Sequence, residues 1–243
     1  VTLGAELVGI ARVTDDMLYE GCSASLPYVI CIGLSMDREE MQHVPHARAA
    51  VEVMRVYREA SRIVIRLAKE IRDMGWTARA YGNPNSTDIL HIPMAINAGL
   101  GELGKHGSLI SQELGSSFRL GAVTTDLPLT PDGPKDSGID EVCASCNVCT
   151  RFCPGEAIKP DKQTVAGVER WIVDRPACEP WFHKLYGCKI CLMVCPLNTR
   201  GKLKTAFQAV AEDIRQVKDA TGMVELIEQR TGEDYANVDV EDE

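Results

Sequence analysis

The chain has 243 residues, 45% of them hydrophobic and 25% charged, which suits one large domain or two small ones. The formal net charge of −9 argues against a broad basic surface, so no nucleic-acid partner is expected. No apolar run approaches the ~18 residues of a membrane-spanning helix, and the sequence shows no secretory or twin-arginine signal.

The N-terminal part carries strand patterns followed by a helix pattern. A short apolar run predicts a strand at 7–11, and a β-branched run predicts a stronger one at 28–34, in which Cys31 is a buried thiol. From 47 to 74, apolar residues recur at three- and four-residue steps, which predicts a long amphipathic helix that ends at Gly75. Because residue 1 already lies within a strand pattern, we expect the chain to be processed or truncated at its N-terminus.

Shorter elements are expected further along. Residues 76–81 predict a strand, 82–86 a loop, and 92–99 a helix with an early proline. A segment with four glycines follows at 99–108, and 118–125 predicts another strand. Clustered glycines let backbone N–H groups approach a large ligand, but they also form tight turns, so the segment is either a cofactor cradle or a structural turn. Its G-x-G-x-x-G match follows a helix rather than a strand, so a nicotinamide site is not supported.

Eight of the ten cysteines fall in two runs, Cys143-x2-Cys146-x2-Cys149-x3-Cys153-Pro154 and Cys178-x9-Cys188-x2-Cys191-x3-Cys195-Pro196. This is the ligand count for two 4Fe–4S clusters. In two-cluster ferredoxins the last cysteine of such a run binds the other cluster. We therefore assign Cys143, Cys146, Cys149 and Cys195 to cluster 1, and Cys153, Cys178, Cys188 and Cys191 to cluster 2.

Two other uses of these cysteines, structural zinc and disulfides, fit the sequence less well. Structural zinc also accepts C-x2-C pairs, but paired knuckles with a plain linker would fit zinc better than two runs that each end in C-x3-C-P. Disulfides would leave the regular spacing unexplained. The runs therefore favour an electron-carrying module at 136–200, after an α/β unit at 1–135 and before a helical tail at 201–243 whose acidic end we expect to be mobile.

Several segments together resemble the cobalamin-dependent reductive dehalogenase family. They are AINAGLGELGKHG at 95–107, TDLPL at 125–129, DGP at 132–134 and the opening LGAELVGIAR at 3–12. The resemblance runs from residue 1 to about residue 198. It implies an α+β fold, with a nitroreductase-like cobalamin-binding unit followed by a ferredoxin-like double 4Fe–4S module. Epoxyqueuosine reductases share this architecture, but the Glu102 and His106 variant and the TDLPL stretch favour the dehalogenase branch.

The resemblance implies that cob(I)alamin reduces an organohalide, with electrons from the two clusters and a proton from a tyrosine. The corrinoid would be base-off, so His106 is not expected to be a lower cobalt ligand. Lys105 stands where many family members have arginine. The residues implied to contact the cofactor are Gly99, Leu100, Gly101, Glu102, Gly104, Lys105, His106, Gly107 and Ser108.

Three catalytic residues follow from the resemblance by position. Tyr57 matches the proton-donor tyrosine, Asn83 a substrate-pocket asparagine, and Arg119 an arginine beside the tyrosine. A cation beside a phenol favours its ionised form, which suits proton exchange near neutral pH. From the residues alone, Tyr57 also fits a core position, Asn83 a turn and Arg119 a surface ion pair.

The implied partners are a small organohalide and an external electron donor, which is a ferredoxin, a flavodoxin or a membrane donor; a homodimer is compatible. The compartment stays open between the cytoplasm and a membrane-associated form exported through a twin-arginine signal that has been removed. Two rival functions remain. One is an epoxyqueuosine reductase, which should need a basic tRNA-facing surface. The other is a corrin-free, ferredoxin-type electron-transfer subunit, which would leave the glycine segment unexplained.

Overall fold

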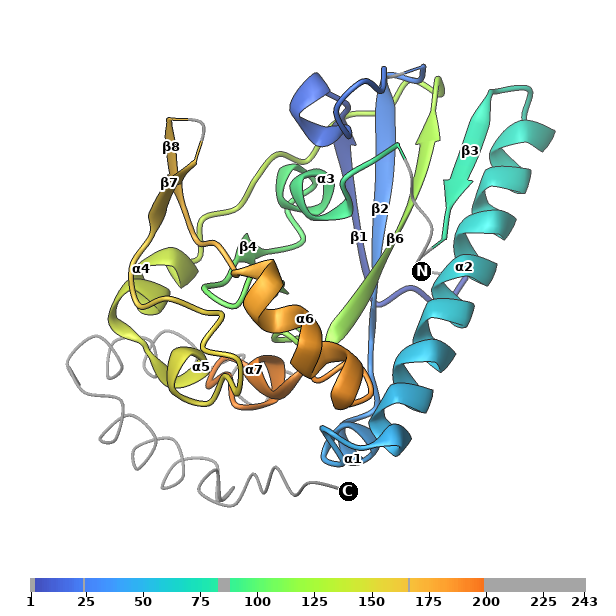
Figure 1. Ribbon diagram of the computed structural model, residues 1–243. Coiled ribbons are helices and arrows are strands. Elements are labelled where there is room, and N and C mark those ends of the chain that lie inside the picture. Colours follow the sequence, from blue (N-terminus) through green and yellow to red (C-terminus); the bar gives the residue numbers. More distant parts are fainter. Residues whose placement is uncertain (1–2, 24, 83–87, 166, 199–243) are drawn as a thin grey trace. The chain divides into compact units, whose positions relative to one another are not determined.

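The computed structural model describes residues 3–23, 25–82, 88–165 and 167–198, which form helices and strands in both halves of the chain (Figure 1). This mixed content agrees with the expected α+β class. Internal contacts divide the chain into two compact units. The first unit comprises Val1–Asp37, Val51–Glu102 and Phe118–Asp136, and the second comprises Arg38–Ala50, Leu103–Ser117 and Ser137–Glu243.

The first unit is built on a four-stranded antiparallel sheet. Its strand order is β1 (Leu7–Arg12), β2 (Tyr28–Ser35), β6 (Phe118–Thr125) and β3 (Ala78–Tyr81). The two central strands are buried on both faces, which explains their nearly continuous apolar sequences. The strands expected at 7–11, 28–34, 76–81 and 118–125 are confirmed, and Cys31 is buried in the sheet as expected.

Helix α2 (Ala47–Asp73) confirms the long amphipathic helix. Most of its length belongs to the first unit, and its buried stripe recurs about every fourth residue. The helix packs against the sheet at Gly121 of β6, where an added Cβ atom would lie 2.9 Å from Val64. Gly75 follows the helix with a φ of +93°, a left-handed conformation that glycine adopts without strain. The stripe consists of Val56, Ala60, Val64, Ala68 and Ile71.

Helix α3 (His91–Asn97) covers the other face of the same sheet. The residues paired with each other across a sheet point to one face, and their sequence neighbours point to the opposite face. Gly9 of β1 lies on the α3 face, where an added Cβ atom would come within 2.0 Å of the Ala98 carbonyl oxygen. Only a glycine allows this close approach.

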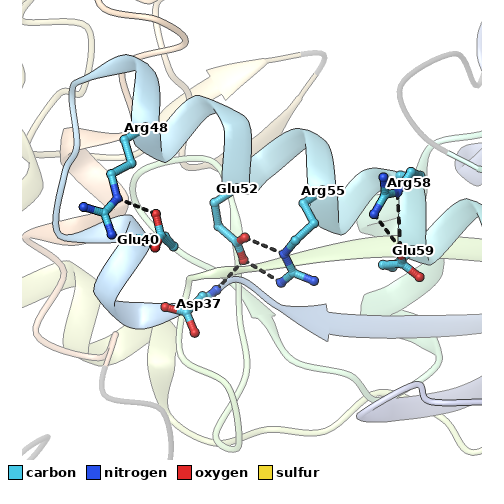
Figure 2. Close-up of polar contacts among 7 residues, drawn as sticks. All are labelled: Asp37, Glu40, Arg48, Glu52, Arg55, Arg58 and Glu59. Atoms are coloured by element: carbon cyan, nitrogen blue, oxygen red, sulfur yellow. Dashed lines mark hydrogen bonds and ion pairs between the residues drawn. The ribbon is translucent and has the colours of Figure 1, made fainter.

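A buried carboxylate joins α2 to the end of β2 in the first unit, as Figure 2 shows. Glu52 is 4% exposed, and its Oε1 atom accepts a 2.5 Å hydrogen bond from the Asp37 backbone N–H. Arg55, one turn further along the helix, donates two hydrogen bonds to the same carboxylate at 2.6 and 2.7 Å. The charge of Glu52 is therefore paired, as burial requires.

The second unit surrounds the cysteine runs with short helices. Its core combines three of the cysteines, Cys143, Cys146 and Cys195, with apolar residues that include Ile139 and Ile190. Its helices are α1 (Arg38–Met41), α4 (Ile139–Ser145), α5 (Val148–Arg151), α6 (Arg175–Lys184) and α7 (Ile190–Met193), and β7 (Gln163–Val165) pairs with β8 (Val168–Arg170).

Three further short elements complete the described chain. They are the 3-10 helix η1 (Asp15–Met17), and strands β4 (Glu102–Leu103) and β5 (Leu109–Ile110), which pair with each other. Among the described residues, no helix has the length and apolar character needed to cross a membrane. The helical tail expected at 201–243 lies outside the described residues.

Candidate functional site: two sets of cysteines and a Tyr–Arg pair

The four cysteines assigned to cluster 1 line one cavity in the second unit. Cys143 lies in α4 and Cys149 in α5. Cys146 directly follows α4, and Cys195 follows α7, about fifty positions after Cys146 in the sequence. All four are buried. The remaining lining residues are Lys105, His106, Val142, Pro196 and Leu197. The structure thus brings Cys195 of the second run to the first three cysteines of the first run.

The surroundings of this set disfavour free thiolates. Burial raises the pKa of Cys143 to about 12, although a hydrogen bond from the Lys105 backbone acts in the opposite direction. Burial also raises the pKa of Cys195 well above its usual value, and the neighbouring Cys143, Cys149 and Cys146 add to the shift. Thiols in such a site ionise readily only when they bind a metal. The donor set therefore suits a cluster of metal ions better than a reactive cysteine.

The second set is also drawn together, but it is less buried. Cys178 lies in α6 and Cys191 in α7, while Cys153 and Cys188 lie in the segments between helices. All four are partly exposed. Burial, together with the fields of Cys188, Cys153 and Cys178, raises the pKa of Cys191 to about 12. The other three members of its predicted set are thus among the neighbours of Cys191.

Backbone amides donate to sulfur atoms in both sets. The Lys105 N–H lies 3.4 Å from Cys143 Sγ, and the Ala157 N–H lies 3.3 Å from Cys153 Sγ. Hydrogen bonds to sulfur ligands are among the factors that set cluster potentials. Among the described residues, no three His, Cys, Asp or Glu side chains form a group that could hold a metal ion. A cluster of four iron atoms is wider than a single ion, so the lined cavity is the relevant geometry.

Lys105 is a buried cation beside the first set. It is 1% exposed, and its Nζ atom donates to Asn147 Oδ1 at 2.8 Å and to the Pro160 carbonyl at 2.7 Å. The ammonium group also lies 4.7 Å from the centroid of the Trp171 ring. Burial lowers the pKa of Lys105, whereas the fields of Cys149, Cys146 and Cys143 oppose that shift.

His106 is the next residue along this loop. It is 6% exposed, and its Nδ1 atom accepts a hydrogen bond from the Ser108 N–H at 3.2 Å. The proton of the neutral ring is thereby assigned to Nε2, which is buried and has no hydrogen-bond partner among the described residues. Burial lowers the pKa of His106 to about 4, so the ring is neutral at pH 7.

The predicted corrinoid-contacting segment is divided between the two units. Residues 99–102 belong to the first unit and residues 104–108 to the second. In the first unit, Leu100 is buried against Gly9, whose added Cβ atom would lie 2.5 Å from it. In the second unit, Lys105 and His106 are buried and belong to the residues that line the cavity of the four cysteines.

Tyr57 and Arg119 lie together in the first unit. The Arg119 guanidinium carbon, on β6, is 5.2 Å from the ring centroid of Tyr57, on α2. Arg119 Nη1 donates to the Phe118 carbonyl at 3.3 Å, whereas its Nε atom is buried without a partner among the described residues. Burial lowers the pKa of Arg119, and Tyr57 partly offsets this shift. Asn83, the third predicted catalytic residue, lies outside the described residues.

Some residues of the site were not predicted from the sequence. Asn147, Pro160 and Trp171 hold Lys105, although they lie at least 42 positions along the chain from it. A short motif carries no signal for such contacts. Asn147 could have been suspected only because it stands inside the first cysteine run.

No family model matches the chain, but individual relatives do. Tetrachloroethene reductive dehalogenase from Desulfitobacterium hafniense is 30% identical over 231 residues, which cover 89% of this chain and 41% of that protein. The protein of the same name from Dehalobacter restrictus is 31% identical with the same coverage. The chain is related to reductive dehalogenases. The resemblance found in its motifs is thus confirmed, and the chain spans about two fifths of the length of these relatives.

Solved structures lead to the same relationship. The catabolic reductive dehalogenase NpRdhA, in complex with 3-bromo-4-hydroxybenzoic acid, has a TM-score of 0.78 at 28% identity, covering 90% of this chain and 34% of that chain. A further reductive dehalogenase structure, with the same TM-score, is described as suggesting a mechanism for B12-dependent dehalogenation.

Epoxyqueuosine reductases are a second group of relatives. The Escherichia coli protein is 33% identical over 138 residues, which cover 50% of this chain and 33% of that protein. An epoxyqueuosine reductase bound to a tRNA stem loop has a TM-score of 0.55 at 17% identity, a likeness that shows the fold alone. All of these relatives are reductases by name, which is the enzyme class expected from the sequence.

Proposed function

We propose that this chain forms the core of a reductive dehalogenase that uses a corrinoid and two 4Fe–4S clusters. The observation that carries the proposal is the cavity lined by Cys143, Cys146, Cys149 and Cys195, because it joins cysteines of both runs as two-cluster ferredoxins do. The relationship to reductive dehalogenases over 89% of the chain supplies the reaction class.

The two cysteine sets would hold the clusters, which carry electrons one at a time. Cavity lining supports the first set, and the mutual fields of Cys191, Cys188, Cys153 and Cys178 support the second. Residues 136–200 would then be a ferredoxin-like module, and residues 1–135 a nitroreductase-like unit. The antiparallel sheet covered by α2 and α3 supports the assignment of a separate α/β unit.

The 99–108 segment would hold the corrinoid, which supplies the low-valent cobalt centre that cleaves carbon–halogen bonds. Its glycines permit close backbone approach, as at Gly99, whose φ is +71°. The side chains of Lys105 and His106 are buried in the second unit, and both residues line the cluster 1 cavity. We therefore assign the corrinoid contacts of residues 104–108 to their backbone.

Tyr57 would give the proton that replaces the halide, and Arg119 would stabilise the tyrosinate that remains. Their 5.2 Å ring contact supports this pairing, as does the buried Arg119 Nε atom that has no partner among the described residues. A buried guanidinium interacts more strongly with a nearby anion than an exposed one does, because little water screens it. Asn83 would orient the substrate. The substrate is a small organohalide, and an external donor supplies the electrons.

Metal and corrinoid analysis of the anaerobically purified protein tests the proposal. We expect cobalt, corrinoid absorbance, and iron and sulfide in amounts that match two cubane clusters. Reduced viologen with a panel of aryl and alkyl halides should then release halide. Iron and sulfide without cobalt would instead indicate an electron-transfer subunit, and conversion of epoxyqueuosine without halide release would indicate the second group of relatives.

A further inference from the structure

Among the described residues of the second unit, no adjacent carboxylate neutralises the charge of Lys105. Both hydrogen bonds of its Nζ atom end on neutral oxygen atoms, those of the Asn147 side chain and the Pro160 carbonyl. Within the described part of the chain, the field of Asp161 also favours the ammonium form, and its effect is smaller than that of each of the three neighbouring cysteines. Burial of an ammonium group costs free energy unless something compensates for it. A negatively charged group close to Lys105 would provide this compensation.

The cysteines of cluster 1 are that negative group once they are ionised. The Lys105 backbone N–H donates to Cys143 Sγ at 3.4 Å, so the residue is fixed directly beside a ligand. The same residue lines the cavity together with all four cysteines of the set. Because the interaction is mutual, a cation that is stabilised by thiolates also stabilises added negative charge on the group that they bind.

The Trp171 ring and the hydrogen bonds keep this charge in place. The ring centroid lies 4.7 Å from Nζ on one side of the ammonium group, a cation–π distance. A lysine side chain in water has many rotamers, whereas this one is 1% exposed and anchored at two oxygen atoms. A fixed buried charge acts on a neighbouring redox centre without the screening that weakens surface charges.

We propose that Lys105 sets the reduction potential of cluster 1 by stabilising its reduced form electrostatically. The inference rests on the proposed function, because it requires a cluster at these four thiolates. The step is a one-electron reduction, in which a reduced donor such as a ferredoxin loses one electron and the cluster gains one negative charge. Lys105 keeps its proton throughout, and no bond is made or broken. Lys105 acts on the cluster through its charge and is not a catalytic residue.

A redox titration of the anaerobically purified full chain, followed by EPR, tests this role. Lys105→Gln retains an amide donor but removes the charge. We expect the ratio of reduced to oxidised cluster 1 at a fixed potential to fall about tenfold, which corresponds to a midpoint potential lower by ~59 mV for one electron. Cluster 2 should keep its potential. The signal of cluster 1 is identified in a Cys153→Ala background, in which cluster 2 is expected to be lost.

Lys162 provides a matched control. Its Nζ atom lies 5.4 Å from the same Trp171 ring, but Asp140 pairs with it at 2.6 Å and its side chain is 29% exposed. Lys162→Gln should therefore leave the potentials of cluster 1 and cluster 2 unchanged. Lys105→Arg keeps the positive charge, so cluster 1 should have the wild-type potential in this variant. An equal shift in Lys162→Gln and Lys105→Gln would overturn the proposal, because a general effect on the fold would then explain both.

Asn147→Asp keeps Lys105 and tests the effect of its charge on the potential of cluster 1 if Lys105→Gln does not fold. A carboxylate at this position would neutralise the ammonium group at hydrogen-bond distance, so the potential of cluster 1 should fall in the same direction. Unchanged potentials in a folded Asn147→Asp or Lys105→Gln protein, with iron and sulfide at wild-type amounts, would overturn the role of Lys105. Absence of cubane clusters from the wild-type protein would instead contradict the proposed function.

Discussion

Cys153 is the last cysteine of the first run in the sequence, but it belongs to the second set of predicted cluster ligands. Its backbone neighbour Ala157 donates to its sulfur at 3.3 Å, and its field raises the pKa of Cys191 in the second set. Cys153→Ala should therefore remove the cluster held by Cys178, Cys188 and Cys191. EPR and iron analysis should show about half of the iron lost, with the cluster of Cys143 intact. Loss of the other cluster would show that the crosswise assignment is wrong.

Tyr57 offers a direct test of the proton donor. Tyr57→Phe keeps the ring that contacts Arg119 but removes the hydroxyl, so dehalogenation should fall by roughly 10²–10⁴-fold, the usual contribution of a positioned acid. Tyr28 is a matched control in the same unit, because the Arg12 guanidinium lies 5.8 Å from its ring. Tyr28→Phe should leave the rate of halide release unchanged. Iron and corrinoid contents should stay at wild-type values in both variants.

At the residue scale, the sequence predicts ligands better than it predicts their surroundings. The cysteines are identified by local spacing, since thiolates on one loop reach neighbouring corners of a cluster. The Tyr57–Arg119 contact was expected only through family resemblance, because α2 and β6 are far apart in the chain. The environment of Lys105 was not predicted, because Asn147 and Pro160 are 42 and 55 positions away from it.

At the element scale, the junction between α2 and the end of β2 depends on Glu52 (Figure 2). Glu52→Ala would leave the Asp37 N–H without its carboxylate acceptor and the Arg55 guanidinium without its ion pair. Loss of a buried hydrogen-bonded charge of this kind should lower the free energy of unfolding of the first unit by about 1–3 kcal/mol. Urea unfolding followed by circular dichroism measures the change.

Glu59→Ala is the matched control for this junction. Glu59 lies on the same helix and pairs with Arg58 and Arg62, but its side chain is 29% exposed and those of both arginines are at least 70% exposed. Ion pairs of this kind contribute little, so the stability should change by less than about 1 kcal/mol. Helix propensity changes equally in the two variants. Equal destabilisation by both would contradict the structural role of Glu52.

Long periodic elements were predictable, and short ones were not. The helix expected at 47–74 and observed as Ala47–Asp73 shows a repeated apolar stripe over many turns, which a sequence reveals directly. Strands β4 and β5 have two residues each, too few to show any period. The four-residue helix α1 is similarly short, and nothing in its sequence distinguishes it from a turn.

At the scale of the whole molecule, the chain order does not match the compact units. Two short segments from the N-terminal half, Arg38–Ala50 and Leu103–Ser117, belong to the unit of the cysteine runs. Within that unit, Ser116 Oγ donates to the Leu192 carbonyl at 2.9 Å, and Ser111 pairs with Gly115 to form a tight turn. Sequence composition marks linkers, but it carries no information on which distant segment completes a core.

The division into two units predicts different responses to loss of iron. The core of the second unit includes Cys143, Cys146 and Cys195, so bound clusters should contribute directly to its stability, whereas the first unit has its own sheet and helices. Removal of iron with a chelator should lower the unfolding midpoint of the second unit, by roughly 4–8 °C for each kcal/mol lost in a domain of about 60–100 residues. The first unit should keep its midpoint. Calorimetry of the native and iron-free full chain, with the Glu52→Ala variant to identify the transition of the first unit, should resolve the two effects. A single transition that shifts as a whole would show that the two units unfold together.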